Sequence, residues 1–240
     1  MRIYKLFLCY HCEVWLLFEP YFMTLSSKLL KFLIRFRYRV NITWLELLNS
    51  DWAKLIFPSH VALMDPVIMF AFLWEKKKLS PVVTESYYNN FLLKWIFNSI
   101  GAIPVPDLTT DKSNELDTSD IVEKIKKSLE NNHNILLYPQ WALARQWFQS
   151  IVGKKTAFYI SQQAPKDIKI LTVSIRWLWG SRSSRAWTWK APNLALFVLK
   201  SLWFIIANLF FFVPKRKVDI EIKDSTPVLH KSEKKMNWCI

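Results

Sequence analysis

Short apolar runs that alternate with amphipathic stretches occupy the chain from about residue 54 onward. The runs predict five strands, several of them bounded by Pro, Asn or Ser: Lys54–Pro58, Pro81–Thr84, Ala102–Val105, Asn134–Tyr138 and Ile168–Ile175. Between the third and fourth runs, residues 118–130 carry apolar side chains at helical spacing, with acidic residues in front and lysines behind. Strands that alternate with helices predict an α/β fold, in which helices cover both faces of a mixed sheet.

Two flanking segments combine apolar bulk with positive charge. Residues 26–39 place Lys and Arg among Leu, Ile and Phe, which predicts a helix in the lipid headgroup layer; the alternative is a solvated basic helix that caps the core. Residues 195–213 are long enough to span a bilayer, but Lys200, Ser201 and Asn208 interrupt their apolar character. We expect an interfacial helix in this segment, with a single transmembrane span as the alternative.

These patterns divide the chain into three parts. Residues 1–42 are predicted to form membrane-associated N-terminal helices, and residues 43–194 the main α/β domain. Residues 195–240 are predicted to complete that domain with an apolar helix, a basic stop and a strand. The strand, Val218–Ile222, alternates apolar and acidic residues and is predicted to lie at an edge of the sheet.

The chain is strongly basic, with 33 Lys and Arg against 19 Asp and Glu and a formal net charge of +14. This charge favours an anionic partner, either a nucleic acid or a phospholipid surface. The basic residues are interleaved with lipid-compatible bulk and no nucleic-acid-binding motif is present, so we expect an anionic membrane surface and no nucleic acid. Three cysteines, at positions 9, 12 and 239, lack disulfide or metal-site spacing, which indicates a reducing compartment and no bound metal.

One His/Asp pair directly follows the first predicted strand. His60 and Asp65 are five residues apart, where the chain turns from a strand toward a helix. In a tight turn, the Asp65 carboxylate holds one imidazole nitrogen of His60 and leaves the other nitrogen as a base. These are two members of the Ser-His-Asp arrangement, with the hydroxyl supplied by a substrate. Spacing alone is weak support, because such pairs also occur by chance.

Further motifs in a fixed order strengthen this interpretation. His60-x4-Asp65 is followed about forty residues later by Ile-Gly-Ala-Ile-Pro-Val at 100–105, and then by Leu-Tyr-Pro-Gln at 137–140. In this order the motifs resemble the first three blocks of the glycerolipid acyltransferases, the lysophosphatidic-acid acyltransferase group. Residues 176–190 and 212–222 extend the likeness. It is closer to the acyltransferase part of bacterial acyl-carrier-protein synthetase/2-acylglycerophosphoethanolamine acyltransferases.

The resemblance implies a glycerol-3-phosphate acyltransferase-like fold and a lysophospholipid acyltransferase. Such an enzyme moves a fatty acyl group from an acyl carrier protein or coenzyme A thioester to a lysophospholipid hydroxyl. His60 is then the general base and Asp65 orients it, with no metal or nucleotide cofactor. The expected location is the cytoplasmic face of a bacterial inner membrane, with monotopic or single-pass attachment. The alternative is a non-catalytic membrane-surface binding protein on the same fold.

The same resemblance implies a set of substrate-binding residues: Ile103, Pro104, Pro139, Gln140, Trp141 and Arg145. Members that make phosphatidic acid usually carry an Arg after Ile-Pro-Val, whereas this chain has Pro106-Asp107, which favours an acceptor with a larger or less anionic headgroup. Gln140 stands where Glu is usual and can hydrogen-bond a glycerol hydroxyl. For Arg145, a phosphate contact and a solvated side chain remain alternatives.

Tryptophan stands where the family has glycine at five positions: Trp44, Trp141, Trp147, Trp177 and Trp189. The chain has 13 Trp and only three Gly, against roughly 17 Gly expected at the usual share of about 7%. A residue without Cβ suits a sharp turn beside a ligand, whereas an indole at position 141 fills space that the acceptor needs. We hypothesise that the gene comes from a lineage that reads UGA as glycine. The alternative is true tryptophans in an aromatic-rich, membrane-bound protein.

Overall fold

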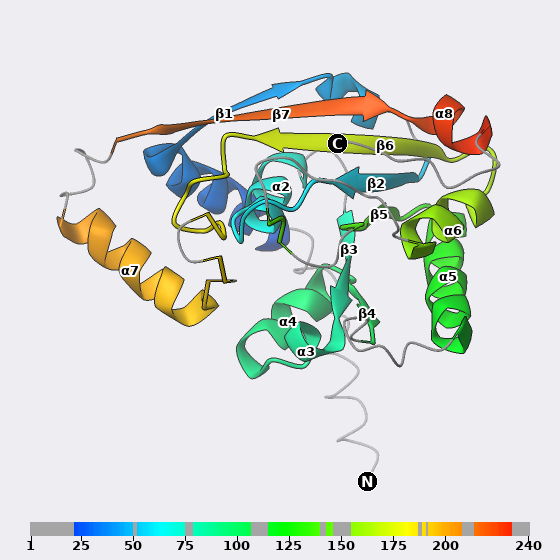
Figure 1. The fold of residues 1–240 in the computed structure, drawn as a ribbon, viewed down its shortest axis with the longest axis horizontal. Coiled ribbons are helices and arrows are strands. Elements are labelled where there is room, and N and C mark those ends of the chain that lie inside the picture. The colour runs from blue at the N-terminus through cyan, green and yellow to red at the C-terminus, as the bar shows by residue number, and fades with distance from the viewer. Residues whose placement is uncertain are drawn as a thin grey trace, which may run out of the picture.

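The computed structural model describes residues 22–49, 52–74, 79–106, 115–139, 143–145, 155–186, 189–190, 192–207 and 214–231 of the chain. Residues 22–37 form a helix, which leads directly into the first strand (Figure 1). The strands are β1 (Tyr38–Thr43), β2 (Lys54–Pro58), β3 (Leu79–Thr84), β4 (Ile103–Val105), β5 (Asn134–Leu136), β6 (Lys169–Arg176) and β7 (Arg216–Asp224). The helices after residue 37 are η1 (Leu45–Leu48), α2 (Asp65–Leu73), α3 (Glu85–Tyr88), α4 (Phe91–Ser99), α5 (Glu115–Glu130), α6 (Lys155–Gln163), α7 (Leu194–Ala207) and α8 (Thr226–Lys231).

The described strands form one sheet in the order β1-β7-β6-β2-β5-β3-β4. Every neighbouring pair is parallel except β6 and β7, which run antiparallel. The predicted α/β fold with a mixed sheet is therefore confirmed. The five predicted strands are present with ends displaced by up to two residues, and the helix predicted over residues 118–130 begins earlier, at Glu115.

Both faces of the sheet are covered, and β2 shows how. Ile56 packs into a core cluster with residues of α2 and of the helix at 22–37, whereas Leu55 and Phe57 pack into a second cluster with residues of α5 and α6. Successive strand residues point to opposite faces, so a strand buried on both sides is apolar throughout. Each such side chain, fully buried, contributes about 1.5–3 kcal/mol. This burial makes β2 a rigid base for the residues that follow it.

Two features at the β1 side of the sheet differ from expectation. The prediction that Val218–Ile222 forms an edge strand is wrong, because β7 lies inside the sheet between β1 and β6. Its alternation arises because Val218 and Ile220 are buried against the core while Asp219 lies on the more open face. The edge strand there is β1, which the sequence did not predict and which extends across the proposed boundary at residues 42 and 43.

The described part of the chain contains no helix that is both long and apolar enough to cross a membrane. The apolar helix α7 has 14 residues and is about 21 Å long, against a hydrocarbon core of about 30 Å. The rest of the predicted 195–213 segment, from residue 208, lies outside the described residues, as do residues 1–21 of the predicted N-terminal helices. A transmembrane segment is thus not supported by the described residues.

Candidate active site

The His60–Asp65 turn connects the buried strand β2 to α2. β2 pairs with β5 on one side and with β6 on the other, so its carboxyl end is held firmly. Ser59 continues this attachment: its N–H donates to the Val173 carbonyl at 2.8 Å, and its Oγ accepts from the Ile175 N–H at 2.9 Å. The turn therefore begins from a fixed point of the sheet.

Asp65 closes the turn with one oxygen. Its Oδ2 accepts hydrogen bonds from the Val61 N–H at 2.6 Å, from the Ala62 N–H at 2.8 Å and from His60 Nδ1–H at 3.2 Å. The residue opens α2, where the positive end of the helix dipole favours a carboxylate. The sequence prediction that a tight turn would bring His60 and Asp65 together is borne out by this geometry.

Asp65 is completely buried, and burial is the main influence on its pKa. Loss of hydration raises the pKa, while the hydrogen bond and charge of His60 and the amides of Ala62 and Val61 lower it; the balance lies above the usual value. Its second oxygen, Oδ1, is buried and has no hydrogen-bond partner within the described part of the chain. The carboxylate is therefore committed to the turn and shielded from bulk water.

His60 presents its other nitrogen as the reactive one. With Nδ1–H donating to Asp65, the lone pair of the neutral ring is on Nε2. The His60 side chain is 15% exposed while that of Asp65 is fully buried, so the imidazole lies at the boundary between core and solvent. This arrangement can accept a proton at Nε2 and stabilise the resulting imidazolium through Asp65.

Tyr138 packs on His60, a contact that the sequence analysis did not assign. The two ring centroids are 4.5 Å apart and the rings are tilted by 43°. The tyrosine hydroxyl is buried without a described hydrogen-bond partner, and burial, together with the Asp65 charge, raises its pKa well above the usual value. Tyr138 thus stays a neutral phenol that limits the movement of the imidazole. The only signal in the sequence is its place immediately before Pro139.

The segment that follows the third sequence block, Leu-Tyr-Pro-Gln at 137–140, contacts the turn through its backbone. The Ala144 N–H donates to the His60 carbonyl at 2.7 Å, and Arg145 follows with an exposed side chain. Pro139 is buried directly after Tyr138. Gln140 and Trp141, predicted to bind substrate, lie outside the described residues. The structure therefore brings Pro139 and Arg145 to the His60 side of the sheet, which leaves both alternatives for Arg145 open.

Ile103 and Pro104 lie farther from the turn than the third block does. They belong to β4 at the sheet edge, separated from β2 by β5 and β3. Parallel strands bring their carboxyl ends to one edge of the sheet, which places the end of β4 on the same side as His60. The contacts described for the His60–Asp65 pair are with Val61, Ala62 and Tyr138, and none of them is with β4.

Residues 177–184, which follow β6, also contact the turn. The Leu63 N–H donates to the Ser183 carbonyl at 2.9 Å, and Ala62 forms an isolated bridge with Ser184. Arg216 fixes the start of this segment, because its guanidinium donates to the carbonyls of Trp177 and Trp179, both at 2.6 Å. The turn is thus held from β6, from the third block and from this segment. No group of three or more metal-ligating side chains occurs among the described residues.

Three of the five suspect tryptophans have left-handed backbone conformations. The φ angles are 63° at Trp44, 72° at Trp177 and 58° at Trp189. Asn132 is the fourth residue other than glycine with positive φ in the described chain, and asparagine tolerates this region. The described tryptophans that were not suspected have no positive φ: Trp52, Trp74, Trp95, Trp179 and Trp203. Trp141 and Trp147 lie outside the described residues.

Comparisons with known proteins give one family. The family model described as Acyltransferase matches residues 39–176, which is more than half of the chain. The fold is similar to that in the crystal structure of the 1-acyl-sn-glycerophosphate (LPA) acyltransferase, PlsC, from Thermotoga maritima, with a TM-score of 0.48 and 15% identity. That similarity covers 93% of this chain and 86% of the other. No curated protein matches the chain significantly.

Proposed function

The chain belongs to the Acyltransferase family and is an acyltransferase, and from this premise we propose that it transfers a fatty acyl group from a thioester to a lysophospholipid hydroxyl. The donor is acyl carrier protein or coenzyme A. The likeness of the ordered sequence blocks to the glycerolipid acyltransferases supports this choice of substrates. Pro106 and Asp107, where an arginine is usual, favour an acceptor with a larger or less anionic headgroup than lysophosphatidic acid.

The site suits direct transfer to the acceptor. His60 Nε2 takes the proton of the acceptor hydroxyl while the hydroxyl oxygen attacks the thioester carbonyl and forms the new C–O bond. The tetrahedral intermediate then collapses, the C–S bond breaks, and the departing thiolate takes the proton from the imidazolium. Asp65 stabilises the positive charge on the ring between these two events.

The hydrogen bond between His60 Nδ1 and Asp65 Oδ2 is the observation that carries this proposal. It selects the tautomer that a general base needs, and a base of this kind contributes about 10²–10⁴-fold to the rate. The amides of Val61, Ala62 and Leu63 are already donating to Asp65 and Ser183. The negative oxygen of the intermediate must therefore be held by donors outside this turn.

We propose that the protein attaches to an anionic membrane, at the cytoplasmic face of a bacterial inner membrane; exposed apolar side chains and cations support the attachment itself. Large hydrophobic residues are exposed on the helix at 22–37 and on α7: Phe22, Leu25, Leu29, Phe32, Leu33, Leu196, Leu199, Leu202, Trp203 and Ile206. Arg37 connects the two helices, because its guanidinium lies 5.6 Å from the Phe204 ring centroid and donates to the Pro214 carbonyl next to β7. Such surfaces enter the headgroup layer while their cations contact phosphates.

The proposal is tested with purified protein in detergent. Acyl carrier protein and coenzyme A thioesters are each combined with lysophospholipids of different headgroups, and products are measured by mass spectrometry. We expect acylated phospholipid from at least one pair, lost in His60→Ala and retained in His133→Ala, an exposed histidine away from the turn. Activity that survives His60→Ala contradicts the mechanism. Vesicle binding without turnover, in every variant, favours the non-catalytic alternative.

We further propose that positions 44, 141, 147, 177 and 189 are glycine in the native protein, decoded from UGA. The positive φ angles of Trp44, Trp177 and Trp189 support this, because the left-handed region costs a residue with Cβ about 1–2 kcal/mol and costs glycine little. Asparagine aside, a bulky residue in this region is an outlier. A glycine at 141 also leaves room for an acceptor beside the third block.

Mass spectrometry of the protein from its native host tests the decoding directly. Peptides that cover residues 44, 141–147 and 177–189 are expected to carry glycine at the suspect positions. Trp179 lies within one of these peptides and has no positive φ, so it serves as an internal control expected to remain tryptophan. Tryptophan masses at the suspect positions contradict the proposal.

A further inference from the structure

The hydrogen bond from His60 to Asp65 is the longest of three that share one carboxylate oxygen. Asp65 Oδ2 accepts from the amides of Val61 and Ala62 at 2.6 and 2.8 Å. Its distance to His60 Nδ1 is 3.2 Å. A bond to one ring atom determines where that atom lies, but it does not determine the plane of the ring. The direction of Nε2, which must meet the acceptor hydroxyl, therefore depends on further contacts to the imidazole.

The Tyr138 ring provides such a contact, with its centroid 4.5 Å from that of the imidazole and a tilt of 43° between the rings. The sheet fixes its position: the Leu137 N–H donates to the Ile56 carbonyl at 2.9 Å and extends the pairing of β5 with β2. Pro139 restricts the backbone of the residue before it to extended conformations. Tyr138 is 8% exposed and belongs to the core cluster that includes Ala62 of the turn. The ring is thus held independently of His60.

This contact also bears on the charge of the imidazole. The face of an aromatic ring attracts a cation that lies within about 6 Å of its centroid. The imidazole becomes a cation when Nε2 takes a proton, and its centroid lies well inside that distance. Tyr138 itself stays neutral, because burial raises its pKa well above the usual value, so its effect on the imidazolium comes from the ring and not from a phenolate.

The ring of Tyr138, rather than its hydroxyl, is the group that meets His60. The hydroxyl is buried without a hydrogen-bond partner among the described residues, whereas the two rings are in contact. We infer that Tyr138 is a positioning residue for His60, whose ring sets the plane of the imidazole and stabilises its protonated form through the π face. The inference rests on the proposed role of His60 as the general base. It divides the stabilisation of the imidazolium between Asp65 and Tyr138.

Kinetics of two substitutions separate the ring from the hydroxyl. Tyr138→Leu removes the π face and keeps an apolar side chain, so we expect kcat to fall about three- to thirtyfold. The midpoint of the acidic limb of the kcat/KM profile is expected to move about 0.5 to 1 pH unit lower, because the protonated imidazole loses a stabilising contact. Tyr138→Phe keeps the face, and we expect kcat within about twofold and an unmoved midpoint. Charged residues on segments that contact the turn, among them Asp65, Arg145 and Arg185, are the same in every variant.

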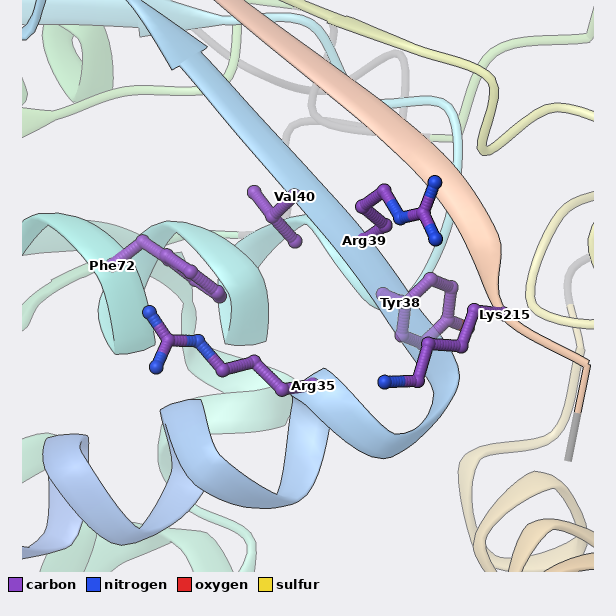
Figure 2. A pocket seen from close by; sticks show the side chains of 6 residues that line it. All are labelled: Arg35, Tyr38, Arg39, Val40, Phe72 and Lys215. Carbon is purple, nitrogen blue, oxygen red and sulfur yellow. The ribbon is translucent and has the colours of Figure 1, made fainter. Parts of the chain in front are cut away.

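Phe72→Leu is the matched control, since it makes the same kind of change in the same core cluster. Phe72 is 7% exposed, close to the value for Tyr138, and both belong to that cluster. Its ring lies on α2 and lines the hollow shown in Figure 2, and none of the residues that line this hollow belongs to the turn. The control is expected to lower the free energy of unfolding, measured with denaturant, without moving the midpoint of the pH profile.

Nuclear magnetic resonance gives a readout that does not require turnover. Isotope-labelled histidine is titrated in the full chain and in each variant, and the His60 signal is assigned by its absence in His60→Ala. We expect the His60 midpoint to fall in Tyr138→Leu and to stay in Tyr138→Phe, while that of His133, exposed and away from the turn, moves in neither. The expected shift in a protein that transfers no acyl group supports the ring contact and contradicts the proposed function, so the two failures are distinguishable.

A fluorinated phenylalanine at position 138 keeps the shape of the ring and weakens its π face, so it tests the inference even if Tyr138→Leu fails to fold. We expect the kcat and the His60 midpoint of this protein to lie below those of Tyr138→Phe. Equal effects of Tyr138→Phe and Tyr138→Leu assign the role to the hydroxyl and overturn the inference. A His60 midpoint that stays fixed in the fluorinated protein overturns it too, because a ring that only fills the core changes stability and not the titration.

Discussion

The turn at His60–Asp65 and the surface formed by the helix at 22–37 and α7 are built in opposite ways. In the turn, buried Asp65 accepts three hydrogen bonds from within the protein, and the neighbouring amides donate to protein acceptors. On the helical surface, by contrast, large apolar side chains are exposed, among them Leu25, Leu29 and Trp203. Asp65 Oδ2 and the amides of the turn are thus paired within the protein, whereas the helical surface leaves apolar groups exposed.

Because of this difference, substitutions in the two regions are expected to impair different properties of the protein. Changes in the turn are expected to affect the chemical step while membrane attachment persists. Changes on the helical surface are expected to weaken attachment while the chemistry on a soluble, short-chain substrate persists. Substitutions in either region therefore show whether catalysis and attachment are separable, and the turn is expected to give the largest effect.

His60→Ala is expected to lower kcat by about 10²–10⁴-fold on a soluble short-chain acceptor, because it removes the general base. Vesicle binding is expected to stay unchanged, since His60 does not belong to the helical surface. Steady-state kinetics and vesicle flotation on the same preparation measure both effects. A variant that loses vesicle binding along with activity shows that the two regions are not separate.

Leu25→Ser with Leu29→Ser tests the opposite side of the comparison. Both side chains are exposed, and full burial of a leucine contributes about 1.5–3 kcal/mol, so vesicle affinity is expected to fall about tenfold or more. The control is Tyr159→Ser with Val228→Ser, two exposed apolar positions on α6 and α8. If kcat on the soluble substrate falls together with vesicle affinity, or the control loses equal affinity, the surface has a different role.

The sequence predicted the features that depend on local spacing. His60 and Asp65 are five residues apart, so a single tight turn determines their contact. Tyr138 was missed because its contact with His60 depends on the pairing of β2 with β5, which no local pattern encodes. The position of β7 was wrong for a related reason: alternation reports which face is buried, while strand order depends on the whole sheet.

The tryptophan prediction shows a different kind of information in the sequence. Composition and family likeness marked five positions, and the backbone at the three described ones adopts φ angles suited to glycine. Trp44, Trp177 and Trp189 are all exposed, so their side chains are not required to fill the core. Backbone geometry, rather than packing, therefore distinguishes the suspect tryptophans from the ordinary ones.

Trp44→Gly, Trp177→Gly and Trp189→Gly are each expected to raise the free energy of unfolding by up to about 1–2 kcal/mol, through relief of the left-handed strain. The matched controls, Trp52→Gly and Trp203→Gly, remove exposed indoles with ordinary backbone angles. Trp203 is within α7, where glycine costs about 1 kcal/mol, so that control is expected to destabilise. Denaturant unfolding measures each difference. Equal changes in the suspect and control positions show that removal of an exposed indole, not strain, is responsible.

The smallest effect is the pH dependence that Asp65 contributes to stability. Burial raises its pKa in the folded protein above the usual value of 3.8, so between these two values the folded state binds more protons than the unfolded chain. The Asp65 contribution is therefore fully favourable below about 3.8 and is lost as pH rises through the raised pKa. Asp65→Asn does not titrate, so the free energy of unfolding of the unmodified protein is expected to fall relative to this variant over that window. Denaturant unfolding of both proteins at several pH values gives the difference. If the difference rises with pH instead, the hydrogen bonds from His60, Val61 and Ala62 outweigh burial, and the turn is built around a stabilised anion.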